Sequence, residues 1–520
     1  MRSSVSSRLT GRGSPPVTGR ALNWYGGDMG LNGKHVVVIG AGISGLTAAY
    51  RAKQAGARVT LVESSAHTGG VLHTEKRDGF LLELGPDCWV SNKPGAMALA
   101  RELGLEADII GTAGGNEKLR QSFILHEGKL TPIPQGFFLL APTSIEALRG
   151  ASVLSWAGKL RVARELFIKA RTDGADESLA SFMERRFGRE ALDRIAQPMV
   201  AGIYTADPAK LSLKATFPQF MDMEREFGSV LRGMRKRAKE MHAHKAAGPR
   251  YGLFVTLKGG VQALPDALSN KLSSTAVGAT YMSPLLSTRA TKIERDGTNW
   301  RVEVEPVEAP RSAGALHSGT LGNAAMALSA DAVIIALPTH AAARLLNGVK
   351  PELARELAGV SYANSAVVNL AFERGQIAHD LNGMGFVVPH VEKREIVACS
   401  FSSVKFEGRA PAGKVLLRAF MGGALLPQQA EYSESQLIET ALRELSQILG
   451  IKGAPLFAVA ARHRASMAQY EVGHLERLAR IEALAAPLSG LRLIGNGYHG
   501  IGIPDCIARA NDAVAALERA

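Results

Sequence analysis

The sequence predicts a mixed α/β fold with an additional, mainly helical part. Short apolar strands alternate with helical segments at both ends of the chain, and a glycine-rich turn separates the first strand, 35–39, from the first helix. Between residues 142 and 250 apolar side chains recur at the three- and four-residue spacings of helices. The 520 residues are 46% hydrophobic and 21% charged, which excludes a disordered chain and provides enough core for several domains.

Composition also limits the function classes. The net charge of +13 favours an acidic partner, but no zinc-finger, RNP-like or bZIP pattern accompanies it, so we expect no nucleic-acid partner. Cys88, Cys399 and Cys506 lie far apart and form no C-x-x-C pair, so we expect neither a disulfide framework nor a metal site. No apolar run reaches the roughly 18 residues of a membrane-spanning helix, and a cytoplasmic protein is expected.

The glycine-rich turn has the spacing of a dinucleotide-binding loop. Gly40, Gly42 and Gly45 form G-x-G-x-x-G between the first strand and the first helix. Gly40 allows the tight turn, Gly42 lets a pyrophosphate approach the backbone, and Gly45 lets the helix pack closely on the strand. The helix N-terminus that follows attracts phosphate charge. A bound dinucleotide, either FAD or NAD, is therefore predicted.

An acidic residue follows where a ribose-binding carboxylate belongs. Glu63 ends the second strand, 58–62, and its carboxylate can accept hydrogen bonds from a ribose diol. The segment HTGGVLHTEKRDGFLLELGPD, from His67, resembles the second glycine motif of the flavin-containing amine oxidase and desaturase superfamily. The late segment IGNGYHGIGIPD, from Ile494, is similar to that superfamily's C-terminal return to the cofactor. The resemblance favours FAD over NAD and implies a helix that begins near Gly502.

Three further segments narrow the resemblance to one family. QPMVAGIYTADPAKLSLKATFPQF from Gln197, LKGGVQALPDAL from Leu257 and YEVGHLERL from Tyr470 resemble the oxygen-dependent porphyrinogen oxidases of haem biosynthesis, from about Lys34 to the end. The resemblance implies noncovalent FAD and oxidation of protoporphyrinogen IX to protoporphyrin IX in three two-electron steps, with O2 as acceptor and H2O2 as product. Oxidation of coproporphyrinogen III to coproporphyrin III is the alternative within the family.

Matching residue by residue implies a set of FAD contacts on five segments. They are Gly40, Ala41, Gly42, Ile43, Ser44, Gly45, Glu63, Ser64, Gly69, Gly70, Gly85, Pro86, Asp87, Ala290, Gly495, Ile501, Gly502 and Ile503. Ala290 stands where the family commonly has Val, and Thr205-Ala206-Asp207 replaces the usual Ala-Gly-Asp.

Substrate contacts are expected at Lys93, Gly202, Tyr204 and Lys258, because a large apolar macrocycle bearing carboxylates needs an apolar pocket with a few cations at its rim. Each lysine is by itself also compatible with a solvated surface position. No catalytic acid or base is assigned. A lone His or Tyr, such as His499 or Tyr204, is more often a structural hydrogen-bond partner than a catalyst. The oxidation itself can proceed by positioning the substrate against the flavin.

The domain organisation follows from these placements. We expect a flexible extension over 1–33, a first FAD-binding part with the start of the substrate domain over 34–141, a mainly helical domain over 142–250, a second FAD-binding part over 251–335, a substrate-binding domain over 336–465 and a C-terminal FAD-binding segment over 466–520. The domains defined by these ranges are interleaved in sequence.

Basic residues gather in the helical part and make it a candidate for peripheral membrane contact. They are Arg149, Lys159, Arg161, Arg164, Lys169, Arg171, Arg232, Arg235, Lys236, Arg237, Lys239, Lys245 and Arg250, with GFFLLAP from Gly136 as a candidate apolar patch. The same charges are also compatible with a solvated face.

Two other functions stay open at this stage. An oxidase or desaturase of the same superfamily would act on amines or carotenoids, and a non-catalytic FAD- or porphyrin-binding protein would bind a porphyrinogen without turnover. The sequence makes no prediction of the oligomeric state.

Overall fold

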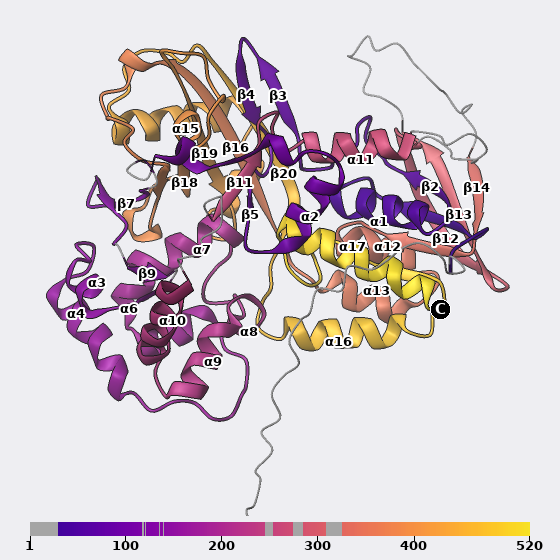
Figure 1. The fold of residues 1–520 in the computed structure, drawn as a ribbon, viewed down its shortest axis with the longest axis horizontal. Helices are drawn as coiled ribbons and strands as arrows, with labels where there is room; N and C mark the ends of the chain where they lie inside the picture. Colours follow the sequence, from indigo (N-terminus) through magenta and orange to yellow (C-terminus); the bar gives the residue numbers. More distant parts are fainter. Residues whose placement is uncertain are drawn as a thin grey trace, which may run out of the picture.

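The computed structural model describes residues 30–116, 119, 121–134, 136–138, 140–244, 253–273, 284–307 and 325–520. The predicted α/β class with a mainly helical part is confirmed (Figure 1). Most of the expected extension over 1–33 lies outside the described residues. In the described part of the chain, no helix has both the length and the apolar character that crossing a membrane requires.

A four-stranded parallel sheet joins the two ends of the chain to its middle. Its strand order is β2 (Arg58–Val62), β1 (His35–Ile39), β15 (Ala332–Ile335) and β21 (Leu491–Leu493). In parallel sheets the carboxyl ends of all strands meet at one edge, and ligands bind outside that edge. The residues that follow these four strands therefore lie next to each other.

Both faces of this sheet are covered, because successive side chains of a strand point to opposite faces. Val36 and Val38 pack with α1 (Ile43–Gln54), α2 (Pro94–Glu102), α11 (Ala263–Ser273) and α17 (Ile503–Glu518). Val37 and Ile39 pack against the antiparallel strands β12 (Thr288–Asp296), β13 (Asn299–Pro306) and β14 (Met326–Ala330), with α12 (Thr339–Leu346), α13 (Pro351–Ala358) and α16 (His474–Ala485) nearby.

A seven-stranded sheet forms the second layer system, beside the helical part in Figure 1. Its order is β20 (Phe457–Ala468), β16 (Tyr362–Glu373), β19 (Lys414–Gly422), β18 (Ala398–Phe401), β17 (Gly385–Val387), β7 (Phe123–His126) and β8 (Lys129–Pro132). Helix α15 (Glu434–Leu449) packs on one face. The hairpin of β3 (Thr74–Arg77) and β4 (Phe80–Glu83) lies on the other face, where Phe80 and Leu82 contact Ala371 and Leu416.

The helical part contains α3 (Ile145–Arg149), α4 (Trp156–Ala163), α5 (Leu179–Arg186), α6 (Arg189–Ala191), α7 (Gln197–Tyr204), α8 (Leu213–Thr216), α9 (Pro218–Phe227) and α10 (Val230–His244). It has its own hydrophobic core, in which Phe182, Met183 and Phe220 are fully buried. One element was not expected: a single π-helical turn, Leu192–Ala196, leads into α7.

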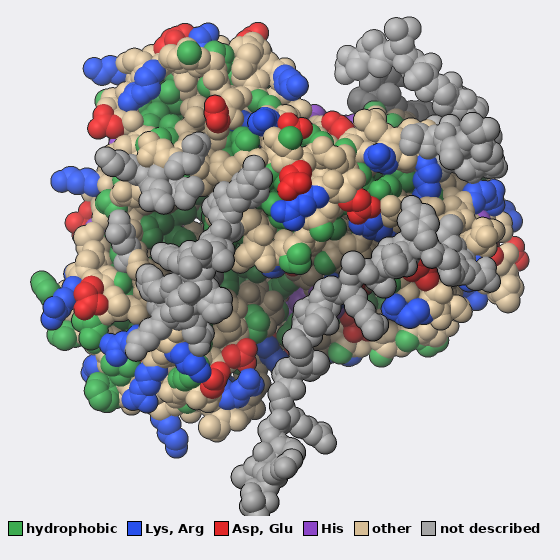
Figure 2. Space-filling view, in the orientation of Figure 1, with side chains coloured by type: hydrophobic (Ala, Val, Ile, Leu, Met, Phe, Trp, Pro, Cys, Tyr) green, Lys and Arg blue, Asp and Glu red, His purple; other side chains and the backbone are tan. Residues whose placement is uncertain are grey.

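The candidate apolar patch from Gly136 is not exposed at three of its apolar positions, whereas Leu139 and the Phe138 side chain lie outside the described residues. Leu140 and Ala141 are buried, and Phe137 packs against the helical core. Large exposed apolar side chains in the described part of this region include Trp156 and Leu160 on α4, which are 75% and 67% exposed, and Phe167, which is 86% exposed. Over α3 and α4, Figure 2 shows hydrophobic side chains beside Lys and Arg side chains at the outer edge of the molecule.

Candidate functional site

The first glycine motif forms a close-packed turn with one open side. A Cβ on Gly45 would lie 1.8 Å from the Gly40 carbonyl oxygen, and a Cβ on Gly40 would lie 2.6 Å from the Ala336 carbonyl oxygen. A Cβ on Gly42, by contrast, would meet nothing within 4 Å. Helix α1 begins with Gly42 as its N-cap, with no side-chain cap and no acidic residue in its first turn. Its first amide groups are therefore available to a phosphate.

Glu63 closes this turn from the second strand. Its carboxylate accepts hydrogen bonds from the Ala41 amide (2.7 Å) and the Ser65 amide (2.8 Å). Its own carbonyl oxygen accepts the Thr288 amide (2.8 Å), which brings the start of β12 and Ala290 toward the same end of the turn. Ser64 is exposed beside it. The structure thus brings Glu63, Ser64 and Ala290 together, where the adenosine end of a dinucleotide is expected.

The second glycine motif packs directly on the first. The Gly69 amide donates to the Ala41 carbonyl oxygen (2.8 Å), and a Cβ on Gly70 would lie 3.2 Å from the Gly42 Cα. A Cβ on Gly85 would lie only 1.7 Å from the Val71 carbonyl oxygen. The two predicted cofactor segments therefore form one continuous surface, made mostly of backbone.

The C-terminal segment completes the same edge of the sheet. Gly495 follows β21 and lies next to Leu337, which follows β15. The predicted helix start near Gly502 is confirmed, because α17 begins at Ile503 with Gly502 as an N-cap that has no side-chain cap. A dinucleotide with a flavin ring fits these residues: Gly42 leaves open space, and two helix N-termini carry no capping side chain.

Asp87 differs from the other expected FAD contacts, because its side chain is engaged in a largely buried ion-pair cluster. Its carboxylate lies 2.7 Å from the Lys405 Nζ and 3.3 Å from an Arg418 nitrogen. These two cations hold the pKa of Asp87 well below its usual range, although burial acts in the opposite direction. Any contact of Asp87 with a cofactor therefore falls to its backbone, as for Gly85 and Pro86.

On the substrate side, the structure places Gly202 and Tyr204 on α7. A Cβ on Gly202 would meet only Val387, at 3.8 Å, so this position borders open space. Tyr204, Val387 and Ile501 are half-buried apolar side chains from three distant segments, and all pack at the edge of the helical core. Burial, with a contribution from the nearby Asp505 carboxylate, raises the pKa of Tyr204 to about 12, so its hydroxyl stays protonated near neutral pH.

The two predicted substrate lysines lie apart. Lys93 Nζ lies 2.7 Å from the Asp505 carboxylate in the first turn of α17, and its side chain is 51% exposed. Lys258 is exposed just beyond the end of β11 (Phe254–Leu257), which pairs antiparallel with β5 (Trp89–Val90). Because the paired strands run in opposite directions, the two lysines lie at opposite ends of this small sheet. Lys93 is the one beside the C-terminal flavin segment.

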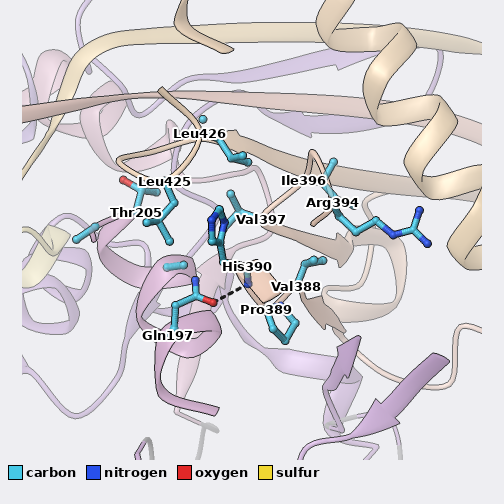
Figure 3. A pocket seen from close by; sticks show the side chains of 13 residues that line it. Gln197, Thr205, Val388, Pro389, His390, Arg394, Ile396, Val397, Leu425 and Leu426 are labelled. Carbon is cyan, nitrogen blue, oxygen red and sulfur yellow. Dashed lines mark hydrogen bonds between the residues drawn. The ribbon is translucent and has the colours of Figure 1, made fainter. Parts of the chain in front are cut away.

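A small cavity of about 20 Å³ lies on another face of α7, between that helix and the seven-stranded sheet (Figure 3). Gln197, Ala201 and Thr205, one turn apart, line it from the helix. Gln197 Oε1 accepts the His390 amide (2.8 Å). Figure 3 shows the His390 ring pointing into the cavity, whereas the Arg394 guanidinium points away. The cavity has room for about one water molecule, so it is no seat for a macrocycle.

Sequence reasoning missed the side chains that support the site from the seven-stranded sheet. Asn369, Arg418 and His463 contact the segment just before Pro86, and Lys405 contacts Asp87. They are widely separated in sequence and lie on ordinary strands or a short helix, so no local motif marks them.

The chain matches the family described as flavin containing amine oxidoreductase over residues 43–517. It is 33% identical to a coproporphyrinogen III oxidase of Bacillus subtilis over 488 residues, 92% of this chain and 97% of the relative. A chloroplastic/mitochondrial protoporphyrinogen oxidase 2 of Arabidopsis thaliana is 27% identical, over 92% of each chain. An Exiguobacterium crystal structure, provisionally assigned as a protoporphyrinogen oxidase, is 27% identical with a TM-score of 0.77, covering 94% of this chain and 99% of that one.

The chain belongs to the flavin-containing amine oxidoreductase family, in the branch that includes the porphyrinogen oxidases. Membership implies FAD as the cofactor, in agreement with the open backbone surface described above.

Proposed function

We propose that this protein is a FAD-dependent porphyrinogen oxidase whose substrate is coproporphyrinogen III. The observation that carries the choice is the difference in identity between its relatives: 33% to the Bacillus subtilis coproporphyrinogen III oxidase against 27% to the Arabidopsis thaliana protoporphyrinogen oxidase 2. The sequence resemblance implies protoporphyrinogen IX as the substrate, and the relatives favour the alternative, coproporphyrinogen III. Coproporphyrinogen III carries two carboxylates more than protoporphyrinogen IX, so the substrates differ in the charge that the site must bind.

The proposed macrocycle site is the space bordered by Gly202 and Val387, beside the C-terminal flavin segment. Gly202 lacks the side chain that would fill it, and half-buried Tyr204, Val387 and Ile501 supply apolar surface. Lys93 supplies a cation at the rim and is held there by Asp505. This combination of apolar wall and rim cation suits an apolar ring with peripheral carboxylates. We propose Lys93, Gly202 and Tyr204 as substrate contacts, while Lys258 lies at the opposite end of the β5–β11 pair from Lys93.

The reaction removes six electrons and six protons from the porphyrinogen in three two-electron steps, and three O2 molecules become three H2O2. Bound FAD would supply the two-electron redox chemistry and the reaction with O2. The chain's own residues bind and orient the macrocycle and exclude water. Tyr204 stays protonated and serves as a hydrogen-bonding and packing group, not as a base. No residue is assigned as a proton acceptor.

We propose that FAD is held noncovalently, by the residues of the five segments predicted from the sequence. The cysteine thiols support this proposal. Burial raises the pKa of Cys88 and of Cys399 to about 12 and that of Cys506 to about 11, so none forms the thiolate that covalent attachment would require near neutral pH. The proposed domain division remains that of the sequence, with the helical domain over 142–250.

We further propose peripheral membrane contact through the helical domain. Trp156 and Leu160 lie on one face of α4, Phe167 follows, and the exposed basic residues Arg149, Arg164 and Lys169 surround them in sequence. Exposed aromatic and aliphatic side chains among basic residues are typical of interfacial helices. Arg161 does not take part, because its guanidinium donates to the Glu184, Arg185 and Arg186 carbonyl oxygens.

Anaerobic mixing of FAD-loaded protein with coproporphyrinogen III tests the proposal. We expect the visible flavin band to bleach and to return when O2 is admitted. Binding without bleaching would identify a non-catalytic binding protein. Bleaching by an amine or a carotenoid precursor, and by no porphyrinogen, would identify another oxidase of the family.

A further inference from the structure

Three successive backbone carbonyls of the second glycine motif are each held by a side chain from the seven-stranded sheet. Asn369 Nδ2 donates to the Glu83 carbonyl oxygen (3.1 Å), and His463 Nε2 donates to the Leu84 carbonyl oxygen (2.6 Å). Arg418 donates to the Gly85 carbonyl oxygen. Burial lowers the pKa of His463, so the ring is neutral near pH 7, and the proton sits on the nitrogen that faces the carbonyl.

Strand register explains how three side chains from three strands reach one segment. Asn369 of β16 pairs directly with Arg418 of β19, so both side chains stand on one face of the sheet. His463 of β20 pairs with Ser365, four residues before Asn369 on β16, and therefore projects from the same face. Strand β4, which ends at Glu83, lies across this face.

The held segment is in direct contact with the cofactor turn. Gly85 packs on the Val71 carbonyl oxygen, and Gly70, next to Val71, packs on Gly42. Contacts therefore run without a break from the substrate-side sheet to the turn that would bind the pyrophosphate. Arg418 also brings a charge: it is 2% exposed and shares Asp87 with Lys405, while the Glu83 carboxylate beside it is paired with Arg409. The cluster therefore holds three cations, Arg418, Lys405 and Arg409, against two carboxylates, Asp87 and Glu83.

We propose that Asn369, His463 and Arg418 are positioning residues that clamp the flavin segment to the substrate-side sheet, and that Arg418 additionally favours the reduced, more negative state of the flavin. This proposal rests on the proposed function only for the identity of the substrate. Its test does not depend on the proposed function. A buried positive charge near a group that gains negative charge on reduction makes reduction easier.

The test uses full-length FAD-loaded protein and measures the flavin reduction potential against a reference dye, the visible spectrum and the FAD dissociation constant. None of these readouts needs a porphyrinogen. Arg418→Met is expected to shift the reduced-to-oxidised ratio at least tenfold toward oxidised flavin, about 30 mV for a two-electron couple, and Arg418→Lys is expected to restore most of it. His463→Leu is expected to change the flavin spectrum, and His463→Gln, whose amide can still donate, to restore it.

Exposed Arg464, next to His463 on the same strand, provides the matched control as Arg464→Gln, with wild-type values expected. If Arg418→Met fails to fold, the test rests on His463→Leu, His463→Gln and Asn369→Leu. Wild-type potential and spectrum in every loaded variant, with only a lower melting temperature, would overturn the clamp and leave a structural role. If no porphyrinogen reduces the flavin of the wild-type protein, the proposed function is refuted. The measurements of potential, spectrum and FAD affinity can still be interpreted in that case.

Discussion

The cofactor side and the substrate side of this site are built from different groups of the chain, backbone in one case and side chains in the other. The cofactor side consists of backbone: Gly40, Gly42 and Gly45 with the glycines of the second motif, in contact through carbonyls and Cα atoms. The substrate-side sheet contributes side chains from distant strands and a short helix, which hold this backbone through buried charge pairs and hydrogen bonds. The first should therefore be sensitive to added volume and the second to removed charge.

The largest effect is expected where added volume meets backbone. Gly45→Ala places a Cβ about 1.8 Å from the Gly40 carbonyl oxygen, whereas Gly42→Ala places one in open space at an ordinary φ of −69°. We expect Gly45→Ala to yield little folded protein. Gly42→Ala should fold with the melting temperature of the wild-type apoprotein but bind FAD at least about tenfold more weakly, as measured by fluorescence titration. Equal FAD affinity in Gly42→Ala and wild type would show that the cofactor does not bind at this turn.

Charge removal should dominate on the other side. Lys405→Met leaves Asp87 with Arg418 as its remaining cation, and breaking a buried pair costs about 3–5 kcal/mol. Because the pKa of Asp87 is depressed in the folded state, the loss should be full at neutral pH and shrink as the pH falls and the carboxyl takes up a proton. Denaturant unfolding at two pH values measures this, and a pH-independent loss would argue against the ion pair.

Glu83 gives an opposite pH signature within the same region. Burial raises its pKa to about 7, so between its unfolded value of 4.5 and about 7 the folded state binds more protons than the unfolded state. Stability contributed by this group should therefore fall as the pH rises through that window, by on the order of 3 kcal/mol. Glu83→Gln should flatten the pH dependence of the unfolding free energy, while the exposed Glu407→Gln should leave it unchanged. If the unfolding free energies of the wild type, Glu83→Gln and Glu407→Gln depend on pH in the same way, the raised pKa of Glu83 is contradicted.

Lys93 tests the rim of the proposed substrate site. Lys93→Gln should raise KM for coproporphyrinogen III about tenfold and leave kcat nearly unchanged, because a charged contact at the periphery contributes about 1.5 kcal/mol or more to binding. Lys258→Gln, the other predicted lysine, should change KM less. Steady-state kinetics at constant ionic strength decide between the two lysines. A larger effect on KM at Lys258 would show that the substrate binds at the Lys258 end of the sheet.

The smallest expected effect is on membrane contact. Trp156→Ala together with Phe167→Ala should reduce binding to anionic vesicles about tenfold and leave turnover in detergent unchanged, because both side chains are exposed and neither packs in the core. Exposed Arg225→Gln on α9 is the matched control. Vesicle sedimentation of the wild type with no bound protein would contradict the contact.

The same contrast decides what could be predicted from the sequence. The turn of Gly40–Gly45, the strand ending before Glu63 and the helix start at Gly502 follow local chemistry, since each glycine and each cap depends on its own neighbours. The clamp residues could not be found in this way. Asn369 and Arg418 become neighbours only through strand register, and the ion pair of Lys93 with Asp505 joins residues more than 400 positions apart. The apolar surface at Trp156 was likewise missed, because exposure depends on which helix face the core covers.

The most direct test of the central claim is the appearance of porphyrin fluorescence in air with purified, FAD-loaded protein. Coproporphyrinogen III and protoporphyrinogen IX are supplied separately, each corrected for spontaneous oxidation. We expect flavin-dependent turnover of coproporphyrinogen III, with kcat/KM at least about tenfold higher than for protoporphyrinogen IX. A preference for protoporphyrinogen IX, or no fluorescence above the enzyme-free control with either substrate, would contradict it.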